Sequence, residues 1–286
     1  MTQQQRIKQN ERLRNKYEKA FYAPVKKALK AQLSSFTNDL VQYGEDAAKR
    51  MMNSELWNKQ MAPVITQLHI QGGLAKANQT LSELRRLPKV QKKRTSFGYN
   101  DEWTAEIIQY FSDHLFDKVV LPISDTTKEY IEKIIKKGID EGWSIEQMVK
   151  EIEREDYLDG RVRRIVRTES NRAINYGNEL AAGKFDYKTQ KRWIAVHDNR
   201  TRHAHLSADG QTVNQDGSFN VGGENLQFPG DPNGSPENTI NCRCFSEVVA
   251  MRDNNGRLVP KEPQPQVRVR GRLRAELQTI LADLNN

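Results

Sequence analysis

A change of residue pattern near Gly183 is the strongest constraint on how this chain of 286 residues can fold. Before it, apolar residues recur three or four positions apart, as at Leu29, Leu33 and Phe36, which is the spacing of a helix with one buried face. After it, short strand-like runs flank residues 207–240, which contain six glycines and three prolines. We therefore expect an α+β protein: a mainly helical N-terminal half followed by a small mixed α/β domain with a long Gly/Pro-rich loop and a basic C-terminal tail.

Shifts in composition divide the chain into four segments. Residues 1–95 are expected to form a basic helical arm and linker, and residues 96–183 a helical lead-in. Residues 184–250 form the domain that carries a C-x-C sequence, and residues 251–286 a basic tail with a short terminal helix. More than one folding unit suits this length, because single cores tend to hold about 100–200 residues.

The lead-in is expected to contain four helices. The first covers DEWTAEIIQYFSDHLFDKVV, and a turn at LPISDTTKEY separates it from the second. Gly142 is placed to end the second helix. Ser144 and Gln147 have the pattern of a capping box that opens the third. The fourth is expected over residues 160–183.

Positive charge is concentrated in two segments. The chain has 45 Lys and Arg residues against 37 Asp and Glu, a formal charge of +8, and residues 1–50 are strongly basic. Residues 84–94 add six basic residues and no acid. Lys and Arg release counterions when they neutralise phosphates, so this segment is a candidate nucleic-acid contact, although such runs also occur as solvated linkers. The candidate contact residues are Arg85, Arg86, Lys89, Lys92, Lys93 and Arg94.

No membrane or targeting segment is expected from the sequence. No apolar run approaches the roughly 20 residues of a membrane-spanning helix. The first residues, MTQQQRIKQNERLRNKYEK, lack the apolar core of a signal peptide. The two cysteines, Cys242 and Cys244, are therefore expected to be reduced thiols of a protein made in the cytosol.

One carboxylate falls on an apolar helix face. Glu169 lies seven positions after Val162 and four before Ala173 on the fourth predicted helix of the lead-in. A buried carboxylate needs a partner, which Arg167, Arg172 or a basic residue of the following domain could supply. A structural ion pair and a catalytic carboxylate are the two interpretations.

Cysteine and histidine are gathered in the C-terminal domain. Cys242 and Cys244 are two positions apart, which on a strand directs both to the same side and makes a disulfide between them strained. Zinc takes Cys and His ligands in a tetrahedron, so His203 and His205 together with the two cysteines would supply four ligands from two strand edges. The alternative is a pair of packed thiols, with His205 hydrogen-bonded to nearby backbone.

The run from Arg167 to Cys244 resembles the phage Mu F-like head morphogenesis family, the minor head proteins of tailed phages. RTESNRAINYG is similar to the Arg-Thr-Glu helix of that family, and KRWIAVHDNRTRHAHLSADGQTV to its Trp strand, Asp-x-Arg-x-x-x-x-His and small-Asp-Gly turn. FPGD and INCRC complete the pattern, and the resemblance covers about residues 100–250. The matching positions are Arg167, Glu169, Trp193, Asp198, Arg200, His205, Asp209, Gly210, Asn241, Cys242 and Cys244.

The sequence departs from this family at one place. Many relatives have His-Pro before Asn-Cys-Arg-Cys, where this chain has Thr239 and Ile240. A fourth metal ligand from that position is absent, so His203 would have to complete a zinc site.

The resemblance implies a minor capsid protein that is not an enzyme. It would act near the portal in head morphogenesis and in DNA packaging or ejection, with portal protein, capsid protein and phage DNA as partners and no membrane. Its place would be the virion, after assembly in the host cytoplasm. One alternative is a metal-dependent nuclease or other hydrolase that uses Glu169, Asp198, His203, His205 and Asp209. A toxin-like transferase is a weaker alternative, since no appended catalytic module, G-x-G-x-x-G or P-loop is found.

Overall fold

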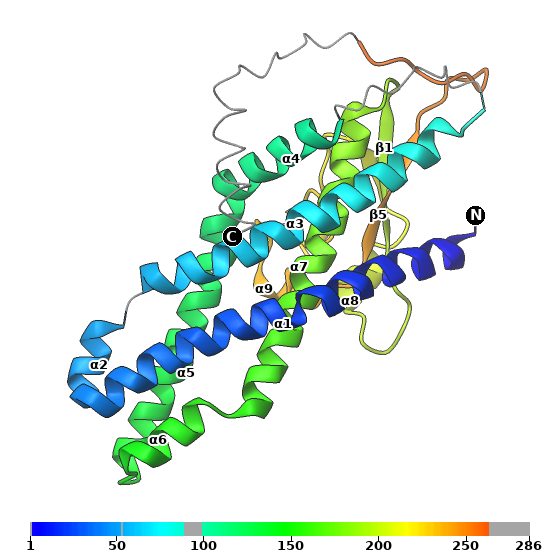
Figure 1. Ribbon diagram of the computed structural model, residues 1–286. Helices are drawn as coiled ribbons and strands as arrows, with labels where there is room; N and C mark the ends of the chain where they lie inside the picture. Colours follow the sequence, from blue (N-terminus) through cyan, green and yellow to red (C-terminus); the bar gives the residue numbers. More distant parts are fainter. Residues whose placement is uncertain (1, 53, 89–98, 263–286) are drawn as a thin grey trace.

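The computed structural model describes residues 2–52, 54–88 and 99–262. Helices form the first part of the chain, and the strands follow (Figure 1). The helical elements of the first part are α1 (Gln3–Tyr43), α2 (Glu45–Met51), α3 (Ser54–Arg85), α4 (Tyr99–Tyr110), the π-helical η1 (Phe111–Val120), α5 (Leu121–Asp140), α6 (Ile145–Ile152) and α7 (Glu155–Lys184). The second part contains β1 (Thr189–Ile194), α8 (His203–Ser207), β2 (Thr212–Asn214), β3 (Phe219–Val221), β4 (Glu224–Leu226), α9 (Pro236–Thr239) and β5 (Phe245–Ala250).

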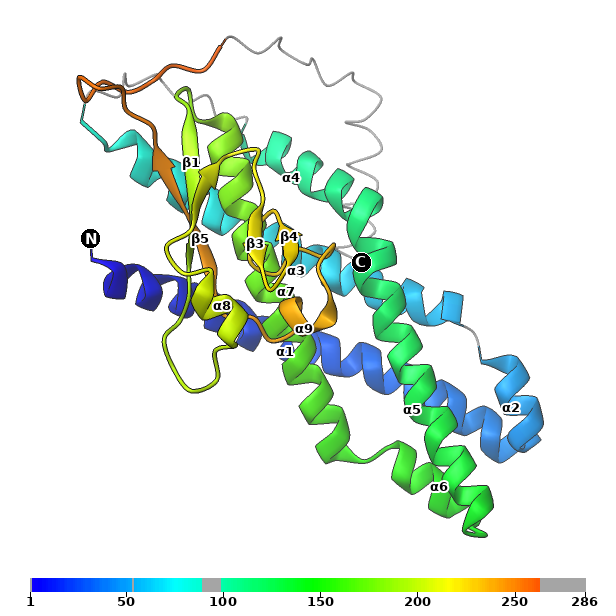
Figure 2. The same cartoon turned by 180° about the vertical axis from the view of Figure 1, so that it is seen from behind.

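Helix α7 is the centre of the molecule. The antiparallel helices α1 and α3 pack against it on one side, and β5 lies against it on another (Figures 1 and 2). One apolar core joins Phe21 of α1, Ile65 of α3 and Val162 of α7. The first two long helices therefore share a core with α7 and form one helical body with it. Helix α7 ends at Lys184, one residue after the domain boundary expected from the sequence.

Two glycines allow α3 and α7 to approach closely. A Cβ placed on Gly177 of α7 would lie 2.5 Å from the carbonyl oxygen of Gly73 in α3. Such a distance is shorter than any real contact of this kind, and backbone cannot move aside as a flexible side chain can. Gly177 is thus a packing requirement of the crossing rather than a helix-breaking residue.

The local signals for helix ends are confirmed. The Ser144 hydroxyl accepts the Gln147 N–H at 3.3 Å, and the Gln147 side chain accepts the Ser144 N–H at 2.7 Å, which completes the predicted capping box. Gly142 ends α5 with a φ of 69°, a conformation that favours glycine. A second capping box, between Thr2 and Gln5, opens α1.

The turn expected at LPISDTTKEY is wrong. Helix α4, the π-helical segment and α5 follow one another without a break from Tyr99 to Asp140. Pro122 stands in the first turn of α5, where its missing N–H removes no bond that the helix needs. The proline that suggested a turn is therefore accommodated within the helical path.

The main sheet is antiparallel, with the strand order β2-β1-β5. Strand β1 pairs with β5 from Thr189↔Ala250 to Ile194↔Phe245. The Gly/Pro-rich loop is more ordered than expected, because it contains β2, the β3–β4 hairpin and α9. Its buried side chains, with those of β1 and the C-x-C turn, form a separate small core of Trp193, Ala195, Ala208, Phe219, Val221, Leu226, Cys242 and Cys244. The α+β class expected from the sequence is confirmed.

None of the helices in the described ranges has the length and apolar character to cross a membrane. Residues 251–262 turn back beside the sheet, with an isolated bridge between Arg252 and Leu258. The predicted terminal helix lies outside the described residues.

Candidate metal centre

Three of the four predicted metal ligands converge in the C-terminal core. The Nδ1 atom of His205 lies 3.6 Å from Sγ of Cys242 and 3.4 Å from Sγ of Cys244. All three ligand atoms lie within 4.8 Å of one another. The side chains are 1–2% exposed, so the group is closed to solvent.

The two cysteines stand in the turn before β5, not on the strand itself as expected. The turn reverses at Asn241, whose φ of 58° lies in the left-handed region that asparagine tolerates. The Asn241 N–H donates to Oγ1 of Thr168 on α7 at 3.0 Å, and the Cys242 N–H donates to the Thr239 carbonyl at 3.3 Å. These bonds hold the C-x-C turn against α7.

The carbonyl of Cys244 is also bound to α7. It accepts the side-chain amides of Asn171 at 3.1 Å and Asn175 at 3.2 Å. One turn farther along, the Asn178 amide donates to the Ser246 carbonyl at 2.6 Å. Residues 171, 175 and 178 share one helix face, so their amides form a row along the edge of β5.

His203 does not join the group. The H-x-H sequence was expected at a strand edge, but His203 and His205 both belong to the short helix α8. Residues two apart on a helix point in different directions, so burial of His205 leaves His203 exposed at the surface. Among the described residues, the metal-ligating group contains only His205, Cys242 and Cys244.

The cysteine thiols have unequal acidities. Hydrogen bonds from the Cys244 thiol and from His205 stabilise a thiolate on Cys242 and lower its pKa well below the ordinary value. The same interaction with Cys242, together with burial, raises the pKa of Cys244. The two thiols therefore lose their protons in separate steps, with the first negative charge on the Cys242 side.

Donor type and spacing fit a zinc ion. Zinc bonds of about 2.3 Å to sulfur and about 2.0 Å to nitrogen, at the tetrahedral angle, put such ligand atoms about 3.5 Å apart. The observed Nδ1–Sγ separations of 3.4 and 3.6 Å agree with this spacing. In the same arrangement Nε2 of His205 is buried without a hydrogen-bond partner in the described part of the chain. A fourth protein ligand is not found among the described residues.

Asp198 and Arg200 lie in the loop between β1 and α8. Both carboxylate oxygens of Asp198 pair with the Arg243 guanidinium at 2.5 Å, and Asp198 also accepts the Arg200 N–H at 3.0 Å. The hydrogen bonds from Arg243 hold the pKa of Asp198 far below its usual range. Because Arg243 stands between the two cysteines, this ion pair fastens the loop to the C-x-C turn.

Asp209 and Gly210 shape the turn after α8. Asp209 accepts the Ala195 N–H at 2.8 Å and pairs with Nε2 of His197 at 2.7 Å. Gly210 has a φ of 78° and donates its N–H to the Trp193 carbonyl at 2.9 Å. Trp193 is fully buried, and its ring stands perpendicular to that of His205 at a centroid distance of 5.6 Å. These residues position the histidine instead of contacting a metal.

Glu169 belongs to a different buried cluster. Its two oxygens accept Nη1 of Arg172 at 2.6 and 2.7 Å, and Oε2 lies 3.0 Å from Nε2 of His69. Arg172 also donates its Nε–H to the Gly230 carbonyl at 2.7 Å. Burial opposes ionisation, but Arg172 and His69 outweigh it and lower the pKa of Glu169. Arg167, the other partner considered, faces Glu18 at 3.7 Å.

The predicted nucleic-acid contacts are only partly described. Arg85 is the last residue of α3, and Arg86 follows it. Lys89, Lys92, Lys93 and Arg94 lie outside the described residues.

Sequence reasoning missed the partners supplied by distant segments. Nothing in the residue pattern indicated that His69 would approach Glu169, or that Asn171, Asn175 and Asn178 would bind the backbone of Cys244 and Ser246. Their three-to-four-residue spacing on the RTESNRAINYGNEL helix is the one signal that could have suggested a polar face with a common partner.

The fold and the centre define an α+β protein with a closed Cys/Cys/His group between a long helix and a small sheet. Residues 129–247 match the model of the family described as Phage Mu protein F like protein. This segment runs from α5 to β5 and includes the whole centre, so this part of the chain is similar to Mu F-like proteins. No curated protein and no solved structure matches the chain significantly. The family resemblance found in the sequence is confirmed over these residues.

Proposed function

We propose that the chain is a head protein of a tailed bacteriophage, with its Cys/Cys/His centre serving the structure of the molecule. The family match over residues 129–247 is the observation that carries this proposal. It supports a bacteriophage head morphogenesis protein, and through that a place in the virion after assembly in the host cytoplasm. Capsid and portal proteins are the partners that this role calls for.

The finer part of the proposal is a position at the portal, with a role in packaging or ejection of DNA. Its physical support is charge. The chain carries a formal charge of +8, and a surplus of Lys and Arg favours association with the phosphates of DNA. Arg85 and Arg86 at the end of α3 and the basic residues that follow them in the sequence are the proposed contact.

A structural centre suits the geometry better than a catalytic one. His205, Cys242 and Cys244 are closed to solvent, whereas a hydrolytic site needs an open position for water and substrate. Of the other residues considered for hydrolysis, Asp198 is bound to Arg243, Asp209 to Ala195 and His197, and Glu169 to Arg172. We accordingly assign no enzymatic activity, and nothing in the geometry favours the nuclease alternative.

Zinc is the proposed ligand of the centre. His205 Nδ1 and the two sulfurs would hold it as three of its ligands. A bound ion would join α8, the C-x-C turn and, through the asparagine row, α7. Structural zinc contributes on the order of 10 kcal/mol to the folding of small domains, so a core as small as this one would depend on it.

The head assignment is tested by isolating heads from cells that produce the phage. Heads are separated from free protein on a density gradient and their proteins identified by mass spectrometry. The chain is expected to sediment with portal and capsid protein. A chain found only in the free-protein fraction of a lysate rich in full heads would contradict the assignment.

A further inference from the structure

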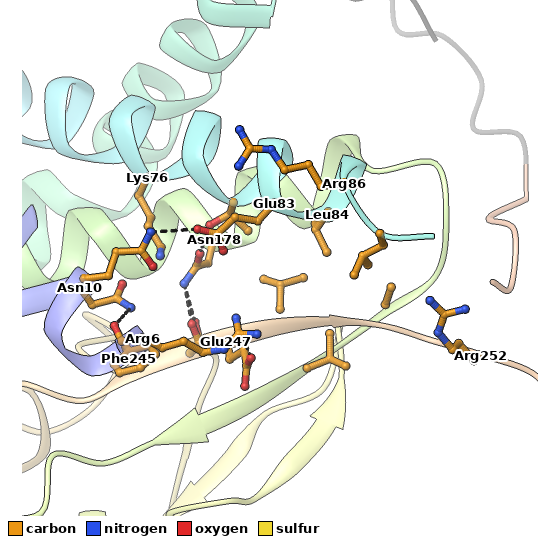
Figure 3. A pocket seen from close by; sticks show the side chains of 17 residues that line it. Arg6, Asn10, Lys76, Glu83, Leu84, Arg86, Asn178, Phe245, Glu247 and Arg252 are labelled. Carbon is orange, nitrogen blue, oxygen red and sulfur yellow. Dashed lines mark hydrogen bonds and ion pairs between the residues drawn. The ribbon is translucent and has the colours of Figure 1, made fainter. Parts of the chain in front are cut away.

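A groove lies along the edge of β5 that does not pair with β1. It has a volume of about 430 Å³ and runs between the C-terminal part of α3, the start of α1 and strand β5 (Figure 3). This volume lies in the range of ligand-binding clefts. Its walls include Leu84 of α3, Leu87 just after that helix, and Val248 and Ala250 of β5.

One wall of the groove is the free edge of β5. The N–H and the carbonyl of Trp193 both form hydrogen bonds to residues on the β2 side. Its partner in β5 is Ser246, which therefore directs its own N–H and carbonyl away from β1. Side chains of α7 satisfy Ser246: its N–H donates to Asn175 at 2.8 Å and its carbonyl accepts from Asn178. The strand period of two gives Val248 and Ala250 the same orientation.

The asparagine row of α7 ends with Asn178, which binds Ser246, and supplies no partner to Val248 or Ala250. Within residues 2–52, 54–88 and 99–262, no hydrogen bond is made by the outward N–H or carbonyl of either residue. Both residues line the groove. An unpaired strand edge of this kind accepts another strand, and its N–H and carbonyl groups fix the backbone of the incoming chain.

The facing wall carries a buried, unpaired cation. Lys76 of α3 is 5% exposed, and its ammonium makes no hydrogen bond or ion pair within the described residues. The nearby carboxylates already have partners: Glu83 accepts from Gln9 at 3.1 Å, and Glu247 pairs with Arg6 at 2.8 Å. Burial lowers the pKa of Lys76 to about 8. Burial disfavours the charged ammonium more than the attraction of Glu83 and Glu247 offsets, so a carboxylate brought by a ligand would stabilise it.

The other charged residues that line the groove are also mostly basic. Arg6, Arg86 and Arg252 join Lys76 around the groove, against Glu83 and Glu247. The lining therefore keeps an excess of positive charge beside an apolar wall. A strand with acidic side chains matches both the charge and the open edge.

We propose that this groove binds an extended acidic peptide segment of a partner protein, which adds to the free edge of β5 and places a carboxylate against Lys76. Main-chain hydrogen bonds to Val248 and Ala250 would hold the segment, and the charged and apolar side chains of the groove would select its sequence. The proposal does not depend on the head assignment, because it is derived from the strand edge and the buried lysine alone.

The test measures fluorescence anisotropy with the full chain and a labelled peptide of alternating glutamate and valine. Two further probes have lysine in place of glutamate, or N-methyl groups on alternate amides. The glutamate peptide is expected to bind at least about tenfold more tightly than either, because charge-assisted and main-chain hydrogen bonds are both required.

Two variants separate the charge from the strand edge. Lys76→Met removes the ammonium, and Val248→Pro removes an outward N–H that β1 does not use, as an edge strand tolerates. Each is expected to weaken binding about tenfold or more, while Lys133→Met, which removes an exposed charge of α5, has no effect. Hydrogen exchange checks the fold: the amides of Glu247 and Val249, which pair with β1, should remain protected in both variants.

Three results would overturn the proposal. The first is no binding of the glutamate peptide to the folded chain, and the second is equal binding by the lysine peptide. The third is competition by a single-stranded oligonucleotide whose affinity drops in Lys76→Met and is unchanged in Val248→Pro. That result would assign the basic lining to nucleic acid.

Discussion

Asn175 takes the place of a neighbouring strand for Ser246. Its Oδ1 accepts the Ser246 N–H at 2.8 Å, while its Nδ2 donates to the Asn171 and Cys244 carbonyls at 3.0 and 3.2 Å. A helix side chain thus covers a strand edge that would otherwise leave buried backbone groups unpaired. The same side chain contacts the turn that holds the two cysteines, so it links the edge of the sheet to the centre.

Asn175→Ala should therefore destabilise the protein. The change leaves the buried Ser246 N–H without an acceptor, and each unsatisfied buried group costs about 1–3 kcal/mol. We expect a loss of about 1–3 kcal/mol in the free energy of unfolding, measured by urea denaturation. Asn225→Ala, at an exposed position of β4, is the control and should be neutral. Equal stability of the two variants would show that the contact is not needed.

Gly177→Ala tests the crossing of α3 and α7. The added methyl group would meet the Gly73 carbonyl at 2.5 Å, so the helices must separate, and overpacking of this kind costs about 1–3 kcal/mol. Gly160→Ala is the matched control on the same helix, because nothing lies within 4 Å of its Cβ position. This control should gain up to about 1 kcal/mol from helix propensity. The account fails if thermal denaturation shows both variants to be stabilised.

Lys76 should make the stability depend on pH in the alkaline range. Its folded-state pKa of about 8 is below the ordinary 10.5, so the charged ammonium destabilises the folded state most strongly below pH 8. Between the two pKa values the unfolded chain still holds the proton that the folded chain has lost. The free energy of unfolding should rise between pH 8 and 10.5, by up to about 3 kcal/mol. Lys76→Met should be more stable than the parent at pH 7 and lack this rise. Urea denaturation from pH 7 to 10 measures it, and an equal rise in the variant would exclude Lys76 as its source.

Glu169→Gln should destabilise the protein, because it leaves the buried Arg172 without its carboxylate partner. Removing one partner of a buried ion pair typically costs about 3–5 kcal/mol. The lowered pKa of Glu169 means that its contribution is present above the ordinary value of 4.5 and is lost as the pH falls through its folded-state pKa. Parent and variant should therefore differ at pH 7 and converge in acid. A constant difference in guanidinium denaturation at every pH would contradict this.

Local features of the structure could be predicted from the sequence. The Ser144–Gln147 capping box, the end of α5 at Gly142 and the strand at Trp193 depend on neighbouring residues, and each is present. Convergence of His205 with Cys242 and Cys244 was also predicted, because a C-x-C sequence near histidines is unusual in a chain otherwise free of cysteine.

Features that depend on distant partners could not be predicted. The Asn171 amide meets the Cys244 carbonyl across 73 positions of sequence, and Glu169 meets His69 across 100. His203 was placed wrongly because five residues are too few to separate a helical turn from a strand edge by pattern. The loop prediction missed β3 and β4 because strands of three residues show no measurable alternation.

The zinc content of the purified full chain is the most direct test of the structural centre. Native mass spectrometry should find one zinc ion per chain in the parent and in His203→Ala, the matched control on the same helix. His205→Ala and Cys244→Ser should lose the ion, and their thermal unfolding midpoints should fall well below that of the parent. A parent chain that carries no metal after purification in the presence of zinc, and unfolds at the same temperature as Cys244→Ser, would contradict the account.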